Sequence, residues 1–187
     1  MPIYTKKGDR GETGLPGKRR LSKTDQLFEV LGNLDQTSAS IGLALSYTEK
    51  KESELIALLK SVQSDFLGIG AYLASENHSQ RAILNHLPKQ ITLFEKTIDK
   101  LENETGSLQN FILPGGGNAG SALHLARTIA RKTEREFHNL TGVKSPEISQ
   151  YLNRLSDLLF QIARAINHRQ GNVEDNWKYL QNKADNR

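Results

Sequence analysis

Most of this chain places apolar residues at the period of an amphipathic α-helix. Leucine and other apolar residues recur at three- and four-residue steps from about Thr24 to Tyr47 and again from Leu55 to Leu73. The same spacing predicts a third helix from about Pro88 to Glu104, which the Thr105-Gly106 pair would end. Each stretch has one apolar stripe and one polar face, so these helices are expected to pack around a common core.

A glycine-rich turn and a proline cap mark two further helices. Residues Pro114 to Ser121 hold four glycines and a proline, so this stretch is predicted not to be helical and to lead directly into a helix that ends near Gly142. Ser145-Pro146-Glu147 supplies a capping hydroxyl, a first-turn proline and an acid for a fifth helix, which Gly171 closes. No segment alternates with period two for long enough to predict a sheet. The sequence therefore predicts an all-α bundle of five helices.

The length of 187 residues suits a single domain. We expect an N-terminal arm over 1–23, the helical bundle over 24–171 and a polar C-terminal tail over 172–187. The chain has no cysteine and no apolar run near the roughly 20 residues that span a bilayer, so disulfides, thiolate metal sites and membrane spans are not expected. The five histidines lack metal-site spacing. The expectation is a cytoplasmic protein without a protein-held metal.

Positive charge is concentrated in the arm. Residues 1–23 hold seven basic and two acidic side chains, while the whole chain has a net charge of +4. The run from Tyr4 to Gly14 combines glycines, hydroxyls and lysines, which can surround phosphate oxygens with N–H groups and positive charge. The arm is therefore predicted to be a phosphate cradle outside any regular element, suited to a nucleotide triphosphate. From composition alone, a solvated arm or a weak RNA contact is equally open.

The predicted fourth helix carries a charged edge beside its apolar stripe. At about 100° per residue, Arg127, Arg131, Glu134 and His138 fall within an arc of roughly 60°, with Arg135 beside it. Two arginines in line can clamp successive phosphates, and a carboxylate between them can orient an arginine or bind a ribose hydroxyl. The preceding glycine-rich turn favours this interpretation, because exposed N–H groups at a helix start attract anions. The alternative is an ordinary salt-bridged helix surface.

Three other residues each have two interpretations. Asp35 lies beside the core stripe of the first helix, either as a buried carboxylate paired with an arginine of the fourth helix or as a rim carboxylate in water. Phe111, just before the glycine-rich turn, is either core filler or the wall of a ligand site. Asn153 lies away from the core stripe of the fifth helix, where a solvated face is the simpler interpretation.

Three segments, in order, resemble the signatures of the PduO-type ATP:cob(I)alamin adenosyltransferase family. They are Ile3 to Thr13, Phe111 to Gly116, and Arg127 with Arg131 to Arg135. The resemblance extends from Ile3 to about His168. It implies a ferritin-like five-helix bundle that assembles as a homotrimer with active sites between subunits.

The resemblance also implies the reaction. Cobalt(I) of the corrinoid attacks the 5′ carbon of ATP, so adenosylcobalamin forms and triphosphate leaves. The nucleophile belongs to the corrinoid, while the protein positions ATP, neutralises the triphosphate and keeps water from the corrin. Mg²⁺ is expected to arrive with the triphosphate. A corrinoid reductase and an adenosylcobalamin-dependent enzyme are the protein partners implied; nucleic acid and membranes are not.

The ATP-site residues of the family map onto two parts of this sequence. The resemblance assigns the catalytic role to Lys23, Arg131 and Glu134. The ATP-binding residues that it implies are Thr5, Lys6, Gly8, Asp9, Gly11, Thr13 and Lys23 from the arm, with Arg131, Glu134, Arg135 and Asn153 from a neighbouring subunit.

On the corrinoid side, the resemblance implies a salt bridge between Asp35 and Arg127 that joins subunits. Phe111 would exclude the lower nucleotide base of the corrinoid, which makes cobalt(II) easier to reduce. The sequence departs from the family's common pattern at Gln36, where an acid is frequent, and at Lys132, where a second arginine is frequent. Lys132 is therefore not expected to act as a phosphate clamp.

Two other functions remain open at this point. A non-catalytic sensor or carrier would bind ATP or corrinoid without turnover, and the altered Gln36 region is the feature that suggests it. A protein that binds RNA or an acidic partner through its basic arm would show a steep salt dependence of binding. The aromatic residues are too few and scattered for base stacking, which disfavours RNA.

Overall fold

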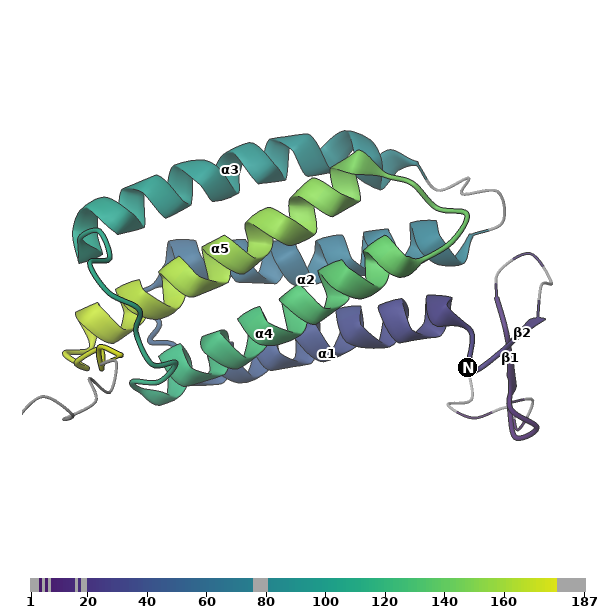
Figure 1. Cartoon of the computed structure of the whole chain (residues 1–187), viewed down its shortest axis with the longest axis horizontal. Helices are drawn as coiled ribbons and strands as arrows, with labels where there is room; N and C mark the ends of the chain where they lie inside the picture. Colours follow the sequence, from purple (N-terminus) through teal and green to yellow (C-terminus); the bar gives the residue numbers. More distant parts are fainter. Residues whose placement is uncertain are drawn as a thin grey trace, which may run out of the picture.

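The structure is a bundle of five long helices with a small hairpin at one end (Figure 1). This computed structural model describes residues 4, 6, 8–15, 17, 20–75 and 81–177. In these ranges, no helix is apolar enough over a sufficient length to cross a membrane. The helices are α1 (Gln26–Tyr47), α2 (Ser53–Ala74), α3 (Ala82–Thr105), α4 (Asn118–Asn139) and α5 (Pro146–Arg169).

The starts of α1 and α5 follow the capping signals of the sequence. The Asp25 side chain accepts a hydrogen bond from the Leu27 N–H at 3.0 Å, and Ser145 accepts one from the Ile148 N–H. Each cap satisfies an N–H group that has no partner within the helix. The predictions for the first and fifth helices are confirmed, with α1 starting two residues after the predicted Thr24.

The start of α3 was predicted wrongly. The helix begins at Ala82 rather than near Pro88, so the proline lies inside its second turn. Leu87 is fully buried, and Ile83 also packs against the core. Burial of this extra apolar turn outweighs the backbone hydrogen bond that the proline cannot donate.

The glycine-rich turn before α4 is shorter than predicted. The helix starts at Asn118, so the last four residues of the stretch that ends at Ser121 are helical. Gly120 sits within this first turn, where a Cβ atom would collide with the Asn167 side chain of α5. Close contact between α4 and α5 therefore stabilises helix despite the low propensity of glycine.

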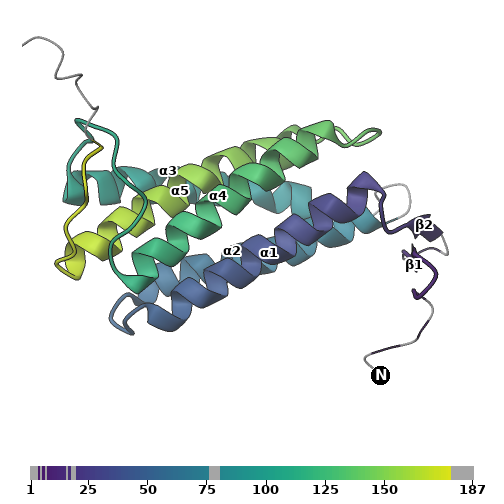
Figure 2. The same cartoon turned by 60° about the horizontal axis from the view of Figure 1, so that its bottom comes forward.

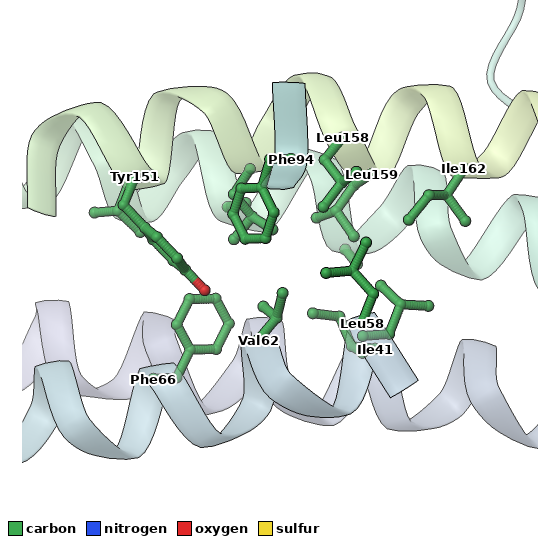
Figure 3. Close-up of a cluster of buried hydrophobic side chains, with 14 of the residues drawn as sticks. Ile41, Leu58, Val62, Phe66, Phe94, Tyr151, Leu158, Leu159 and Ile162 are labelled. Atoms are coloured by element: carbon green, nitrogen blue, oxygen red, sulfur yellow. The ribbon is translucent and has the colours of Figure 1, made fainter. Parts of the chain in front are cut away.

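The core lies between the five helices, where α4 packs against both α1 and α5, α3 against α5, and α2 against α1. Figure 3 shows its centre, where apolar side chains of the helices interdigitate. Tyr151 is fully buried there, with its ring 5.1 Å from that of Phe94 and 6.5 Å from that of Phe66 between ring centroids. Aromatic contacts at these distances stabilise a core beyond their buried area.

One buried polar network crosses this core and was not predicted. Asp65 on α2 is only 4% exposed, and Oδ2 accepts hydrogen bonds from the Tyr151 hydroxyl and the Gln90 amide, both at 3.0 Å. His86 Nε2 lies 3.1 Å from Asp65 Oδ1. Burial raises the pKa of Asp65, and the three partners oppose that rise. The network joins α2, α3 and α5.

The arm contains regular structure, contrary to the prediction. Strand β1 (Glu12–Gly14) pairs in antiparallel register with β2 (Arg20–Ser22), and Thr13 lies opposite Leu21. Figures 1 and 2 show this hairpin beyond the N-terminal end of α1. Leu15 and Leu21 pack against the core and so attach the hairpin to the bundle. A two-stranded ribbon of three-residue strands is too short to leave an alternating pattern in a sequence.

The segment after α5 runs beside the segment before α4, at the opposite end of the bundle (Figures 1 and 2). The Trp177 N–H donates to the Phe111 carbonyl at 2.7 Å, and the Leu113 N–H donates to the Asp175 carbonyl at 2.8 Å. Of the expected polar tail, residues 172–177 thus contact the body of the protein, and 178–187 lie outside the described residues.

Candidate active site

The arm folds so that Lys23 lies directly over the backbone of Gly8. A Cβ atom added at Gly8 would lie 3.3 Å from Lys23 Nζ, so glycine leaves room for the ammonium group. Gly11 has a φ of +81°, a conformation that glycine adopts without strain. Its carbonyl accepts a hydrogen bond from the Lys23 N–H at 2.8 Å. The structure therefore brings together three of the predicted arm residues around one positive charge.

The remaining predicted arm residues are less tightly arranged. Lys6 has a φ of +58°, and its ammonium group lies 6.0 Å from the centroid of the Tyr4 ring. Asp9 is exposed and Thr13 is half-buried within β1. Thr5 lies outside the described residues.

On α4, Arg131 and Arg135 are both exposed, and no described carboxylate forms an ion pair with either. Arg135 Nη1 donates to the Arg131 carbonyl at 3.1 Å. Lys132, in contrast, is paired with Glu29 of α1 at 2.7 Å. Both side chains of this ion pair are exposed to solvent, so the pair contributes little to the stability of the fold. It does neutralise the charge of Lys132. This arrangement agrees with the expectation that Lys132 is not a phosphate clamp.

A polar seam joins the charged edge of α4 to α5. Asn153 Nδ2 donates a hydrogen bond to Glu134 Oε1 at 3.0 Å, and the Ser149 hydroxyl lies 3.1 Å from His138 Nε2. Glu134 and Asn153, which are 19 positions apart in the sequence, are therefore direct neighbours in one chain. A single hydrogen bond leaves the carboxylate free to accept others, for example from a ribose hydroxyl.

Arg127 lies near the middle of α4, close to Phe160 of α5, which His124 also contacts. The Arg127 guanidinium carbon is 5.8 Å from the centroid of the Phe160 ring. The centroids of the His124 and Phe160 rings are 5.7 Å apart. His124 is 3% exposed, and both of its ring nitrogens, like Arg127 Nε, lack a hydrogen-bond partner among the described residues. Burial, and then the Arg127 charge, lower the pKa of His124 to about 4. Burial, followed by the nearby Arg131 charge, also lowers the pKa of Arg127.

Asp35 is exposed, as expected of a rim carboxylate. It lines a cavity of about 300 Å³ between α1 and α2, next to Leu67, which is 78% exposed. Arg127 instead faces Phe160 of α5. Asp35 and Arg127 form no ion pair within the described chain.

The glycine-rich turn is occupied by a side chain of its own chain. Asn167 of α5 accepts a hydrogen bond from the Gly117 N–H at 3.1 Å and donates one to the Gly115 carbonyl at 2.9 Å. The turn also lies 14 residues, or about 21 Å of helix, before Arg131. The prediction that this turn supports the arginines in binding one anion is therefore wrong within a chain, because Asn167 fills the space beside it.

Phe111 is not core filler. Its side chain is 80% exposed at the end of the bundle where α4 begins. The Phe111 backbone is hydrogen-bonded to Trp177, while the aromatic ring is exposed to solvent. An exposed aromatic ring in a fixed segment can bind an apolar ligand. Of its two interpretations, the ligand wall is the one that the exposure supports.

Comparisons with known proteins show which family has this sequence and fold. The family model for cobalamin adenosyltransferase matches residues 3–166. The chain belongs to the cobalamin adenosyltransferase family. The corrinoid adenosyltransferase MMAB of Bos taurus is 37% identical over 182 residues, covering 94% of this chain and 76% of the relative. The corrinoid adenosyltransferase of Bacillus subtilis (strain 168) is 38% identical over 177 residues, covering 91% and 89%.

Solved structures show the same fold. A variant of the PduO-type ATP:corrinoid adenosyltransferase from Lactobacillus reuteri, complexed with cobalamin and ATP, matches with a TM-score of 0.87 at 29% identity. The match covers 95% of this chain and 97% of that chain. The resemblance read from the three sequence segments is thereby confirmed at the level of family and fold.

One cavity of this adenosyltransferase contains none of the predicted site residues. It has a volume of about 680 Å³ and lies between α2 and α3. Its cations are paired, because Lys100 lies 3.0 Å from Glu54 and Arg169 is paired with Glu52. Positive charge that is already neutralised is a poor partner for a polyphosphate, so this cavity is a poor candidate for a phosphate site.

Two buried residues near the candidate site of this adenosyltransferase have no signature in the sequence that marks their contacts. They are His124, one of the five histidines without metal-site spacing, and Asn167 of α5. That His124 is buried and has no hydrogen-bond partner among the described residues is visible only in the structure. No group of histidine, aspartate and glutamate within the described ranges could hold a metal ion.

Proposed function

We propose that this enzyme transfers the 5′-deoxyadenosyl group of ATP to cob(I)alamin, forming adenosylcobalamin and releasing triphosphate. The observation that carries the proposal is the presence of two separate cationic elements, the Lys23–Gly8 arrangement in the arm and the unpaired arginines of α4. Family membership supplies the corrinoid and ATP as substrates.

The ATP site would be completed by two subunits. The hairpin stands beyond the end of its own bundle (Figure 2), which favours contact with a neighbouring chain. In this proposal, Lys6 and Lys23 of one subunit and Arg131 of the next surround the triphosphate. Four negative charges on ATP would meet several cations that are not committed to carboxylates, which stabilises the leaving group as charge builds on it. Mg²⁺ would be carried by the triphosphate itself.

Glu134 would fix the nucleoside end of ATP. Its carboxylate is held by Asn153 and faces the same edge of α4 as Arg131. A positioned carboxylate that accepts from a ribose hydroxyl would orient the 5′ carbon toward the cobalt, and correct orientation accounts for much of the rate of a displacement reaction. The proposal needs no protein nucleophile, because the reduced corrinoid supplies the electron pair.

A homotrimer would bring Asp35 and Arg127 together. The two side chains lie on different faces of one chain, Asp35 over the groove between α1 and α2 and Arg127 against Phe160 of α5. Because Asp35 and Arg127 lie on different faces of one chain, a salt bridge between them would form across the interface of two subunits. Formation of that bridge would also compensate the partly buried charge of Arg127.

Phe111 would occupy the lower face of the corrinoid and exclude its nucleotide base. A four-coordinate cobalt(II) is easier to reduce to the nucleophilic cobalt(I). A cytoplasmic setting, a reductase and a downstream adenosylcobalamin-dependent enzyme belong to the same proposal, and the cysteine-free sequence is compatible with a reducing compartment.

The test is an anaerobic reaction of the full chain with ATP and chemically reduced cob(I)alamin. We expect the visible spectrum to change from that of cob(I)alamin to that of adenosylcobalamin, with one triphosphate released per corrinoid consumed. Binding of both substrates without product would contradict the proposal and favour the non-catalytic sensor or carrier. Release of phosphate and diphosphate in place of triphosphate would contradict the proposed displacement at the 5′ carbon.

A further inference from the structure

The cavity of about 680 Å³ between α2 and α3 has a largely apolar lining. Leu55 and Leu58 of α2 and Leu101 of α3 line it and are at most 8% exposed, while Leu93 of α3 also lines it and is 45% exposed. A concave site of this size, with an apolar lining and a few polar groups, is typical of the places where proteins bind small molecules.

The charged side chains of this cavity neutralise one another. Each cation in the lining has a carboxylate partner: Lys100 lies 3.0 Å from Glu54, Lys51 lies 3.1 Å from Glu49, and Arg169 is paired with Glu52. A charged ligand would have to compete with these pairs, so the lining favours an uncharged ligand. The pair of Lys100 and Glu54 joins α3 to α2 and is solvent-exposed on both sides, so its opening to admit a ligand costs little free energy.

One polar side chain of the lining has an acceptor atom without a partner. Gln90 of α3 is 6% exposed, and its Nε2 donates to Ser61 Oγ at 3.1 Å and to Asp65 Oδ2 at 3.0 Å. No described group donates to its Oε1. In the described ranges, the fully buried side-chain atoms without a partner belong to His124 and Arg127. Gln90 Oε1 is therefore accessible, and the space that Gln90 borders is the cavity.

The buried network fixes the orientation of this amide. Asp65 Oδ2 also accepts a hydrogen bond from the Tyr151 hydroxyl at 3.0 Å, so the carboxylate takes donors from α3 and α5 together. Figure 3 shows the Tyr151 hydroxyl pointing toward α2. A carboxylate oxygen binds the N–H side of an amide and leaves the amide carbonyl for another donor. Gln90 therefore offers the cavity an acceptor and not a donor.

We infer that this cavity binds an uncharged small molecule with an apolar body and one N–H or O–H donor. The apolar body packs against the leucines of the lining, and the donor bonds Gln90 Oε1. A ligand that supplies the missing donor gains affinity over one of the same shape that cannot, because the second leaves the acceptor unpaired. None of the residues assigned to ATP or the corrinoid lines the cavity, so the inference does not depend on the proposed function.

The direct test is a titration of the full chain with indole and with N-methylindole, followed by NMR. Both probes are uncharged and apolar and have nearly the same shape, but only indole has an N–H donor. We expect indole to bind saturably, with nuclear Overhauser effects from its ring to methyl groups of Leu55, Leu58 and Leu93. We also expect it to bind at least about threefold more tightly than N-methylindole. Indole that shows no such contacts up to its solubility limit, or that binds no better than N-methylindole, would overturn the inference.

A variant that fills the cavity tests the location of the probes. Ala57 lines the cavity from α2, so Ala57→Phe places a ring there without removing a side-chain hydrogen bond. It should weaken the binding of both probes about tenfold or more. Ala82→Phe, at an exposed alanine of α3 outside the lining, is the matched control and should leave both affinities within about twofold. Unchanged affinities in Ala57→Phe would mean that the probes bind elsewhere, which contradicts the inference.

A second variant tests the acceptor. Gln90→Leu removes Oε1, so it should abolish the preference for indole while N-methylindole still binds. A preference that persists in the folded variant would assign the donor to another group and end the role of Gln90. If Gln90→Leu does not fold, the probe pair and Ala57→Phe still decide the question. The titrations contain neither ATP nor corrinoid, so their outcome is separate from that of the adenosyl-transfer assay.

Discussion

Asn153 on α5 donates a hydrogen bond from its side-chain nitrogen to Oε1 of Glu134 on α4, at 3.0 Å. The sequence alone favours a solvated position for Asn153, and in the structure its side chain is indeed exposed while it also bonds the proposed ribose-binding carboxylate. This contact couples the two helices at the point where ATP is proposed to bind. It lies entirely within one chain, so the hydrogen bond itself does not depend on the subunit arrangement.

Removal of Asn153 should therefore act through Glu134. We expect Asn153→Ala to lower kcat/KM for ATP about tenfold and Glu134→Ala to lower it about hundredfold. The double variant should resemble Glu134→Ala, because residues in one hydrogen-bonded pair are not additive. Steady-state kinetics of the four proteins measure the coupling. Additive losses would show that Asn153 acts on ATP independently of Glu134.

The two exposed arginines of α4 should differ in their effect on turnover. Arg131 lies in the middle of the proposed phosphate clamp, whereas Arg135 lies one turn further and bonds the Arg131 carbonyl. We expect Arg131→Ala to reduce kcat/KM for ATP about hundredfold or more and Arg135→Ala to reduce it less than about fivefold. Lys132→Ala, which removes the solvated pair with Glu29, serves as the control and should leave turnover nearly unchanged. Equal, mild effects at Arg131 and Arg135 would contradict the clamp.

The proposed bridge between subunits can be tested by charge reversal. Asp35→Arg and Arg127→Asp should each weaken the assembly and raise the KM for cob(I)alamin, because each places like charges face to face. The double variant restores the pair in reverse and should recover part of both losses. Sedimentation and steady-state kinetics give the two readouts. If the double variant is as impaired as the worse single variant, Asp35 and Arg127 do not meet.

Apolar periodicity, together with the glycine and proline signals, was sufficient to predict five helices, whereas the family was predicted from three motif segments. The stripes of α1, α2 and α5 bury the same leucines and isoleucines that the pattern selects, because tertiary packing uses the face that amphipathicity creates. The start of α3 was predicted wrongly because a proline is most often found in the first turn of a helix. Here the burial of Leu87 stabilises a helix that begins earlier and includes Pro88 in its second turn.

The contacts between distant segments could not be read from the pattern. The hairpin strands are too short to alternate, and Asn167 in front of the glycine-rich turn is a polar residue within an apolar helix with no local signature. The Asp65–Tyr151 hydrogen bond joins residues 86 positions apart. Such contacts depend on how the helices pack in space, and they leave no local pattern in a single sequence.

Phe111 should matter for reduction more than for alkyl transfer. Its side chain is 80% exposed, so Phe111→Ala is expected to change the free energy of unfolding by less than about 0.5 kcal/mol. Turnover coupled to the reduction of cob(II)alamin should fall at least about tenfold, while turnover of chemically reduced cob(I)alamin falls much less. The spectrum of bound cob(II)alamin checks the cause, since the variant should contain less of the four-coordinate form. Equal losses in both assays would refute the exclusion of the lower base.

His124 should make the protein less stable in mild acid. Its pKa lies at about 4 in the folded protein against an ordinary value of 6.5, because burial and the Arg127 charge both oppose protonation. The unfolded chain therefore binds more protons than the folded chain between these values, so the contribution of His124 to stability is full above pH 6.5 and is lost as the pH falls toward 4. Relative to His124→Gln, the wild-type free energy of unfolding should fall progressively over this range, as measured by urea unfolding at several pH values. Titration of the His124 ring by NMR measures the pKa of His124 in the folded protein directly. A midpoint near 6.5 would contradict the prediction and show that the imidazole is hydrogen-bonded to water or to another molecule.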